Sequence, residues 1–165
     1  MSIHSLKSLI IALVMLCAFE LRAQMPAQAP VAYGASVTLE NAKKAAAAAL
    51  AEARKNNWTM AVAVVDTGGN LVYYEKMDNT QLGSANVAID KARSATLFKR
   101  PTKAFQDTLA GGGSGLRILG VEGAVPVDGG YPLIMDGKIV GAVGVSGDTA
   151  DHDGQCAKVG ADALK

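Results

Sequence analysis

The sequence has few of the residues that mark several common classes of protein. Its 165 residues include only two cysteines and two histidines, and 5% are aromatic. Two cysteines are too few for a zinc ribbon or for a small domain held together by disulfides. Lysine and arginine number 16 against 15 acidic residues, so no basic surplus exists to neutralise nucleic-acid phosphates. These shortages disfavour nucleic-acid binding and a disulfide scaffold, while the 50% hydrophobic content predicts a folded domain.

An uninterrupted apolar run stands near the start of the chain, at residues 9–19. It is too short to cross about 30 Å of hydrocarbon, but it has the length of a signal-peptide core. We therefore expect residues 1–23 to be a signal peptide cut after the small residue Ala23. This predicts a periplasmic or secreted protein with no membrane segment after cleavage. Residues 24–37, rich in Ala, Gln and Pro, are expected to be a flexible tether, and 38–165 the folded domain.

Apolar runs separated by turn residues predict a mixed α and β domain. Asp136-Gly137, between two such runs, is the strongest hairpin signal because a type I′ turn needs two residues with positive φ. Since hairpins dominate, we expect an α+β sandwich with a five-stranded, mostly antiparallel sheet flanked by helices. The expected strands are 59–65, 71–76, 124–127, 131–135 and 139–145. The expected helices are 39–56, 85–99, 103–110 and a last one ending near Leu164, with N-caps at Thr38, Ser84, Thr102 and Asp148 or Thr149.

Glycines gather in two places. Residues 111–115 read Gly-Gly-Gly-Ser-Gly, but no Lys-Ser/Thr pair follows, so a flap or helix stop is favoured over a phosphate loop. Gly141, Gly144 and Gly147 recur every third residue in the last expected strand, which leaves room for close approach of another backbone.

The last helix carries His152, the only histidine that remains once the expected signal peptide is removed. It is either a metal or haem ligand or a helix-end histidine satisfied by water or a carboxylate. Cys156, one turn further on, is more typical of a small buried hydrophobe than of a nucleophile. Lys99, Arg100 and Lys103 form a basic cluster that either binds an anionic group or is simply solvated. Tyr74 lies at a strand end and either lines a pocket or closes an edge.

Several segments resemble the GlcG/HbpS-like family, and their order holds from about residue 39 to 164. They are Val64-Val65-Asp66 with Gly69, Lys76-Met77-Asp78, Lys91-Ala92-Arg93, Glu122 to Pro126 and, most specifically, Gly141 to Gly147. The resemblance implies a profilin-like sandwich that assembles into homo-oligomers, often octamers. It also implies haem binding, in some members with haem degradation or iron sensing, and it makes Thr102 a hydroxyl candidate for the haem site.

These observations predict a secreted or periplasmic haem-binding protein that works as a homo-oligomer. His152 is the expected iron ligand, with Thr102 as a weak oxygen ligand and Arg100 or Lys103 beside the propionates. Tyr74 and Tyr131 are the next candidates for the ligand. The alternative is a small-molecule enzyme or accessory protein acting on a hydroxy- or keto-acid, in which Asp66, Lys91 and Ser146 would do the acid–base work.

Overall fold

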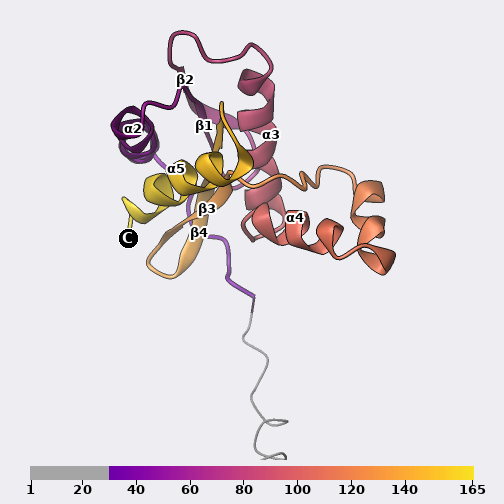
Figure 1. Cartoon of the computed structure of the whole chain (residues 1–165). Coiled ribbons are helices and arrows are strands. Elements are labelled where there is room, and N and C mark those ends of the chain that lie inside the picture. The colour runs from indigo at the N-terminus through magenta and orange to yellow at the C-terminus, as the bar shows by residue number, and fades with distance from the viewer. Residues whose placement is uncertain (1–29) are drawn as a thin grey trace, which may run out of the picture. The chain divides into compact units, whose positions relative to one another are not determined.

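A four-stranded antiparallel sheet lies at the centre of the computed structural model, which describes residues 30–165 (Figure 1). The strand order is β2-β1-β4-β3, so the long strand β4 lies inside the sheet between β1 and β3. The predicted signal peptide, residues 1–23, and the first part of the predicted tether, residues 24–29, lie outside the described residues. The strands are β1 (Ala61–Val65), β2 (Leu71–Lys76), β3 (Gly130–Met135) and β4 (Lys138–Ser146).

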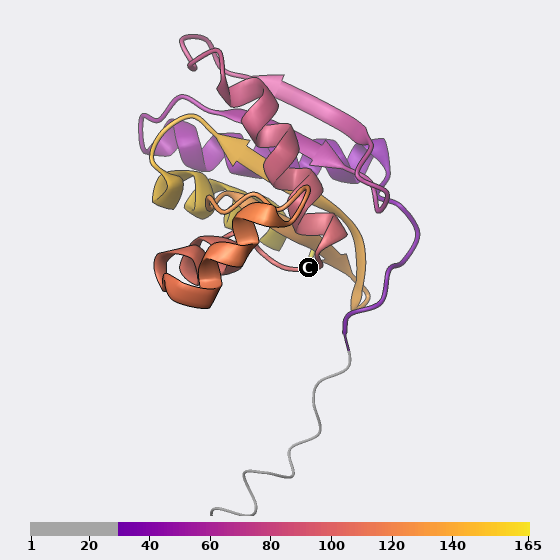
Figure 2. The ribbon, with the colours of Figure 1, turned by 90° about the vertical axis from the view of Figure 1, so that its right-hand side faces the viewer.

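Helices cover both faces of the sheet. Helices α2 (Leu39–Lys55) and α5 (Ala150–Asp162) pack on one face, and α3 (Ser84–Leu97) packs on the other (Figures 1 and 2). Strand β1 shows how the two cores are built, because successive side chains point to opposite faces. Val62 and Val64 belong to the α2 and α5 core, and Ala61 and Ala63 face α3. The α3 side is lined by small residues, so this helix lies close to the sheet.

The structure confirms most of the predicted elements. Asp136 and Gly137 have φ of 50° and 71°, as the turn between β3 and β4 requires. Thr38 and Thr149 are the N-caps of α2 and α5, and their hydroxyl oxygens accept hydrogen bonds from the backbone N–H of Asn41 and of His152. The predicted helix at 103–110 is α4 (Lys103–Ala110).

The fifth predicted strand, at residues 124–127, is wrong: this segment is an irregular loop in the described chain. Pro126 has no N–H to give to a strand ladder. The N–H of Val125 donates to Ser94 Oγ at 3.0 Å, and the N–H of Asp128 donates to Gln106 Oε1 at 2.8 Å. Side chains therefore take the hydrogen bonds that a neighbouring strand would have made.

One predicted cap is wrong, and a second is correct in position only. Gly83 is the N-cap of α3, while Ser84 is its first residue and its hydroxyl bonds to Ser146 Oγ at 3.2 Å. Thr102 is the N-cap of α4, as predicted, but its side chain makes no capping hydrogen bond. Both hydroxyls instead make contacts between segments far apart in the sequence.

Residues 31–37, predicted as part of the tether, are attached to the fold. The N–H of Gly34 donates to Ile139 O at 2.8 Å, and the N–H of Val37 donates to Val140 O at 2.7 Å. Val37 is 7% exposed and belongs to the core. This segment continues along β4 beyond the end of β1.

Helix α4 and the 3₁₀ helix η1 (Gly113–Gly120) form an arm that projects from the rest of the domain (Figure 2). Gly112 and Gly113, at the start of η1, both have positive φ and turn the chain back after α4, as expected for a glycine-rich helix stop. No residue of η1 is buried. Among the described residues, no helix has the length and apolar character needed to cross a membrane.

Candidate functional site

A cavity of about 230 Å³ opens at the β3 edge of the sheet, and we call it the Tyr131 pocket. Its walls combine prolines and aliphatic residues with one phenol and several lysines. Ligand pockets typically pair such an apolar lining with a few polar groups that orient the ligand. The lining residues are Val31, Lys99, Pro101, Tyr131, Pro132, Ile134, Ile139, Lys158, Ala161, Asp162 and Lys165.

The charges around the Tyr131 pocket are mostly positive. Lys158 Nζ lies 2.5 Å from Asp162 Oδ2, and Lys165 pairs with the other oxygen of the same carboxylate. These two hydrogen bonds lower the pKa of Asp162, so the carboxylate stays charged. Lys99 Nζ donates to Val31 O at 3.1 Å and lies 4.2 Å from the centre of the Tyr33 ring. The lining thus carries three lysines and one aspartate, and this excess of positive charge favours an anionic ligand.

The phenol of Tyr131 is half-buried and packs against the main core. Burial raises its pKa, and the nearby Asp128 carboxylate acts in the same direction, while Lys103 acts against it. The phenol is therefore protonated at neutral pH. Tyrosine is an established iron ligand in haem proteins, and it then binds as the phenolate.

His152 lies in the first turn of α5, stacked on the ring of Trp58 with 3.8 Å between ring centroids and 13° between planes. Its Nδ1 is 3.0 Å from Asp148 Oδ1. A carboxylate on one ring nitrogen is the usual way to orient a histidine that binds a metal through the other. The side chain is 38% exposed, and Nε2 makes no hydrogen bond within residues 30–165. The imidazole could thus offer one nitrogen, Nε2, to a metal, and it lies away from the Tyr131 pocket.

The structure separates His152 from the Tyr131 pocket. His152 lies at the N-terminal end of α5, whereas the pocket is lined by Lys158, Ala161 and Asp162 at the other end. Ten helical residues correspond to roughly 15 Å along the axis. His152, the expected iron ligand, and Tyr131, one of the next candidates, therefore belong to different parts of the surface.

Thr102 is completely buried, and its Oγ1 accepts a hydrogen bond from Gly130 N at 2.9 Å. Its own N–H donates to Gly130 O at 3.0 Å. The residue therefore fixes the start of β3, directly before Tyr131, and its hydroxyl faces the backbone of its own chain. The predicted role of Thr102 as an iron ligand stays a prediction, and its observed role is to position the pocket wall.

The two predicted propionate partners lie on either side of Thr102 and are both exposed in part. Arg100 Nε donates to Phe98 O at 3.0 Å, and its guanidinium lies 5.6 Å from the Phe105 ring centre. Lys103 pairs with Asp107 at 2.6 Å, and this hydrogen bond raises the pKa of the lysine. Neither residue lines the Tyr131 pocket, although the two sequence neighbours of Arg100, Lys99 and Pro101, do line it.

Tyr74 lies far from Tyr131. It belongs to β2, at one edge of the sheet, while Tyr131 belongs to β3 at the other edge. Tyr74 packs against the core under α3, and Tyr131 packs against the core under α2 and α5. Burial raises the pKa of Tyr74, so it too is a protonated phenol at neutral pH.

The acid–base cluster of the alternative prediction does not form. Asp66 closes the turn after β1 by accepting the N–H groups of Gly68 and Asn70 at 2.8 and 2.9 Å. Ser146 pairs with Ala61 at the opposite end of β1, about 16 Å away. Asp66 is thus a turn residue, out of reach of Ser146.

Lys91 is instead part of a buried ion pair. Its Nζ lies 2.7 Å from Asp153 Oδ2 and donates to Val145 O at 3.1 Å, and both side chains are at most 4% exposed. Burial raises the pKa of Asp153, and Lys91 opposes that rise. The pair is enclosed between α3, β4 and α5 and has no access to a substrate, so the structure gives it a structural role.

Two features of the pocket escape sequence reasoning. Lys158 and Lys165 flank Asp162 as an ordinary charged helix face does, so their pattern carries no sign of a pocket. Pro132 and Ile134 were predicted only as strand residues.

The interpretation of Cys156 as a small hydrophobe agrees with the structure, because the thiol is buried and burial raises its pKa to about 12.

Comparisons with known proteins agree with this fold. The family model described as "Haem degrading protein HbpS-like" matches residues 37–162. Protein GlcG of Escherichia coli K12 is 38% identical over 100 residues, which cover 61% of this chain and 73% of GlcG. The crystal structure of a Streptomyces reticuli HbpS double mutant is 34% identical, with a TM-score of 0.73 over 85% of this chain and 99% of that one.

A second solved structure, the PduOC:heme complex, is 26% identical, with a TM-score of 0.70, and covers 79% of this chain and 96% of that one. The likeness thus extends over nearly all of the described fold, including the sheet and the helices on both of its faces. Because the family model alone covers well over half of the sequence, the assignment does not depend on any single relative. The chain belongs to the HbpS-like family.

Proposed function

We propose that this protein binds haem and that the Tyr131 pocket holds it. The observation that carries the proposal is the meeting, in one cavity, of an apolar wall, a phenol and three lysines. Its family and its likeness to the PduOC:heme complex support the same ligand. The donor set fits the group, because haem presents an apolar ring, two carboxylates and an iron that accepts a tyrosine ligand. Bound haem supplies the redox chemistry of its iron.

Each part of the pocket has a separate task. Pro101, Pro132 and Ile134 exclude water from the face of the ring, and Lys99, Lys158 and Lys165 offer ammonium groups to the carboxylates. Tyr131 would hold the iron through its phenol oxygen and would lose the phenolic proton to solvent on binding. The cavity is smaller than the roughly 300–1,000 Å³ usual for ligand sites, so part of the ring stays outside it.

The first prediction separates Tyr131 from His152. In a hemin titration followed by absorbance, Tyr131→Phe is expected to weaken binding at least tenfold, about 1.4 kcal/mol, and to shift the Soret band. His152→Ala should change the affinity for hemin by less than twofold. Its Soret band should lie at the wild-type position within experimental error. Each variant removes one candidate ligand and keeps the rest of its site.

The reverse pattern would place the iron on His152, as the sequence predicted, and would overturn the pocket assignment. A wild-type protein without a saturable spectral change would overturn haem binding itself. Circular dichroism on both variants provides the control that neither has unfolded. Tyr74→Phe is the matched tyrosine control, and it should bind hemin as the wild type does.

We also propose that the protein works as a homo-oligomer. The arm formed by α4 and η1 exposes apolar side chains, with Leu116 and Leu119 at 54% and 66% exposure. Exposed apolar residues gathered on one feature favour association. Light scattering on the chain from residue 24 onward should therefore show a mass well above that of one chain. A monomer at micromolar concentration would contradict this proposal.

We further propose that the protein is exported to the periplasm or the medium, and this proposal is supported by the apolar run at residues 9–19. Haem degradation and iron sensing are finer forms of the same proposal. The description of the family supports haem degradation, and both activities depend on haem being bound first.

A further inference from the structure

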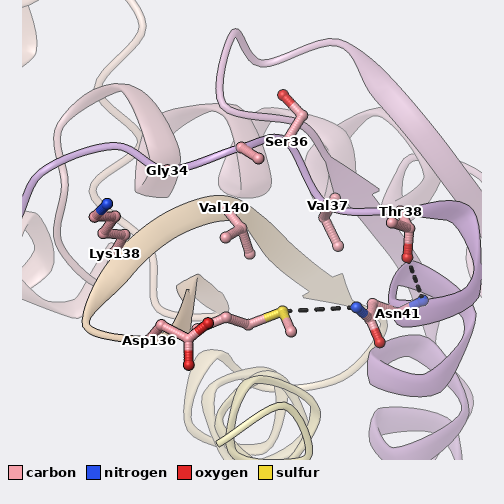
Figure 3. A pocket seen from close by; sticks show the side chains of 10 residues that line it. Gly34, Ser36, Val37, Thr38, Asn41, Asp136, Lys138 and Val140 are labelled. Carbon is pink, nitrogen blue, oxygen red and sulfur yellow. Dashed lines mark hydrogen bonds between the residues drawn. The ribbon is translucent and has the colours of Figure 1, made fainter.

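A second cavity, of about 340 Å³, lies between segment 34–38, the start of α2 and the β3–β4 hairpin, and we call it the Asn41 pocket. One wall is the backbone of residues 34–38, and the others come from the start of α2 and from the β3–β4 hairpin (Figure 3). Val37, Val140 and Met135 form an apolar centre, and polar side chains stand around it. The lining residues are Gly34, Ala35, Ser36, Val37, Thr38, Asn41, Met135, Asp136, Lys138 and Val140.

The walls of this pocket are held in place without a ligand. Segment 34–38 is hydrogen-bonded to β4 through the N–H groups of Gly34 and Val37, at 2.8 and 2.7 Å. Thr38 caps α2 and thereby fixes the first turn, which carries Asn41. The hairpin side is fixed by the tight turn at Asp136 and Gly137. A preformed cavity costs little to order when a ligand binds.

The Asn41 carboxamide has unused hydrogen-bonding capacity. Within residues 30–165 its side chain makes one hydrogen bond, from Nδ2 to Met135 Sδ at 3.6 Å. A thioether sulfur is a weak acceptor, and the amide oxygen accepts from no group in this part of the chain. Figure 3 shows the amide on the helix side of the cavity. A half-buried amide with a free donor and a free acceptor is suited to a ligand group that offers both.

Opposite charges stand at the other end of the pocket. Asp136 and Lys138 flank Gly137 on the hairpin, and in Figure 3 both lie across the cavity from Asn41. Both side chains are exposed, and neither forms an ion pair with another of the described residues. Asp136 and Lys138 thus bring one charge of each sign to this end of the cavity, which matches a ligand that carries both charges.

We propose that the Asn41 pocket binds a small zwitterion, namely an α-amino acid with a short aliphatic body and a carboxamide end. Lys138 pairs with its carboxylate and Asp136 with its ammonium. Met135, Val37 and Val140 contact the methylene groups, and Asn41 exchanges two hydrogen bonds with the terminal amide. L-Glutamine has this arrangement of groups and is the probe of choice. The site is separate from the Tyr131 pocket and does not depend on haem binding.

The test is calorimetric titration of the full domain with three matched probes. L-Glutamine should bind saturably. Glutaramate, which lacks the ammonium, and 4-aminobutanamide, which lacks the carboxylate, should each bind at least tenfold more weakly. Lys138→Gln, Asp136→Asn and Asn41→Ala should each weaken glutamine binding at least fivefold, because the first two each remove one charge contact and the third removes both amide hydrogen bonds. Asparagine is suited to the positive φ of position 136, so that variant keeps the turn.

Lys43→Gln, on the exposed face of α2 and outside the pocket, is the matched control and should bind as the wild type does. The proposal is overturned if glutamine does not bind, if all three probes bind alike, or if the pocket variants bind as the control does. Hemin titration of the same variants keeps the two proposals apart, because haem binding should be unchanged in all of them.

Discussion

Replacing Lys91 by methionine is expected to lower the free energy of unfolding by about 3–5 kcal/mol. The lysine is 1% exposed, and its ammonium is the charge partner of Asp153 at 2.7 Å. Methionine fills a similar volume but leaves the aspartate charge buried without a partner. It also leaves Val145 O without the hydrogen bond from Nζ. Urea denaturation followed by circular dichroism measures the loss directly, and the melting temperature should fall by roughly 10 °C.

A double-variant cycle shows whether this loss comes from the pair. Asp153→Asn removes the partner charge. The double variant Lys91→Met/Asp153→Asn should therefore lose less free energy of unfolding than the sum of the two single losses, by at least about 1 kcal/mol. Lys103→Met is the control, because its partner Asp107 is 61% exposed and such pairs contribute about 0–1 kcal/mol. Additive single effects, or an equal loss in the control, would show that the buried pair is not the cause.

The same pair helps to position the proposed haem pocket. A Cβ at Gly129 would lie 2.9 Å from both Lys91 Nζ and Asp153 Cβ, so the loop before β3 rests directly on the ion pair. The next residue, Gly130, makes two hydrogen bonds with Thr102: its N–H donates to Thr102 Oγ1, and its carbonyl oxygen accepts from the N–H of Thr102. Tyr131 follows at once. A buried ion pair, a buried threonine and two glycines therefore set the place from which the phenol enters its pocket.

Local patterns predicted the strands and helices well, because each depends on neighbours in the sequence. The Asp136-Gly137 turn, the apolar run of β1 and the caps of α2 and α5 are all short-range features. The error at residues 124–127 has a different origin. That loop is held by Ser94 and Gln106, which are about 20 to 30 residues away along the chain. Apolar composition alone does not distinguish such a loop from a strand.

The candidate site was only partly predictable for the same reason. Tyr131 and the basic residues near Pro101 are visible in the sequence, but no pattern brings Lys158 and Lys165 to them. The Asn41 pocket joins segments that are 94 residues apart, and its amide reads as an ordinary first-turn residue. His152 stood out because it is rare in the chain, and rarity does not place a residue beside a cavity.

The glycines of β4 were predicted to allow close approach of another backbone, and Gly144 does so in the most crowded place. A Cβ at this position would lie 2.0 Å from Ala88 O and 2.6 Å from Ala92 N, which both belong to the backbone of α3. Neither atom can rotate away as a side chain can. Helix α3 therefore packs on the centre of the sheet only because residue 144 has no side chain.

Gly144→Ala is accordingly expected to lower the free energy of unfolding by about 3 kcal/mol, at the upper end of overpacking effects, because α3 must move as a unit. Gly120→Ala is the matched control, since a Cβ there meets nothing within 4 Å, and its stability should stay within about 0.5 kcal/mol of the wild type. Both values come from urea denaturation at one temperature. A Gly144→Ala protein as stable as the control would mean that α3 is not held against β4 as closely as the structure shows. If α3 does move, Lys91 moves with it, so the variant should also weaken hemin binding in the Tyr131 pocket, which no change confined to the arm should do.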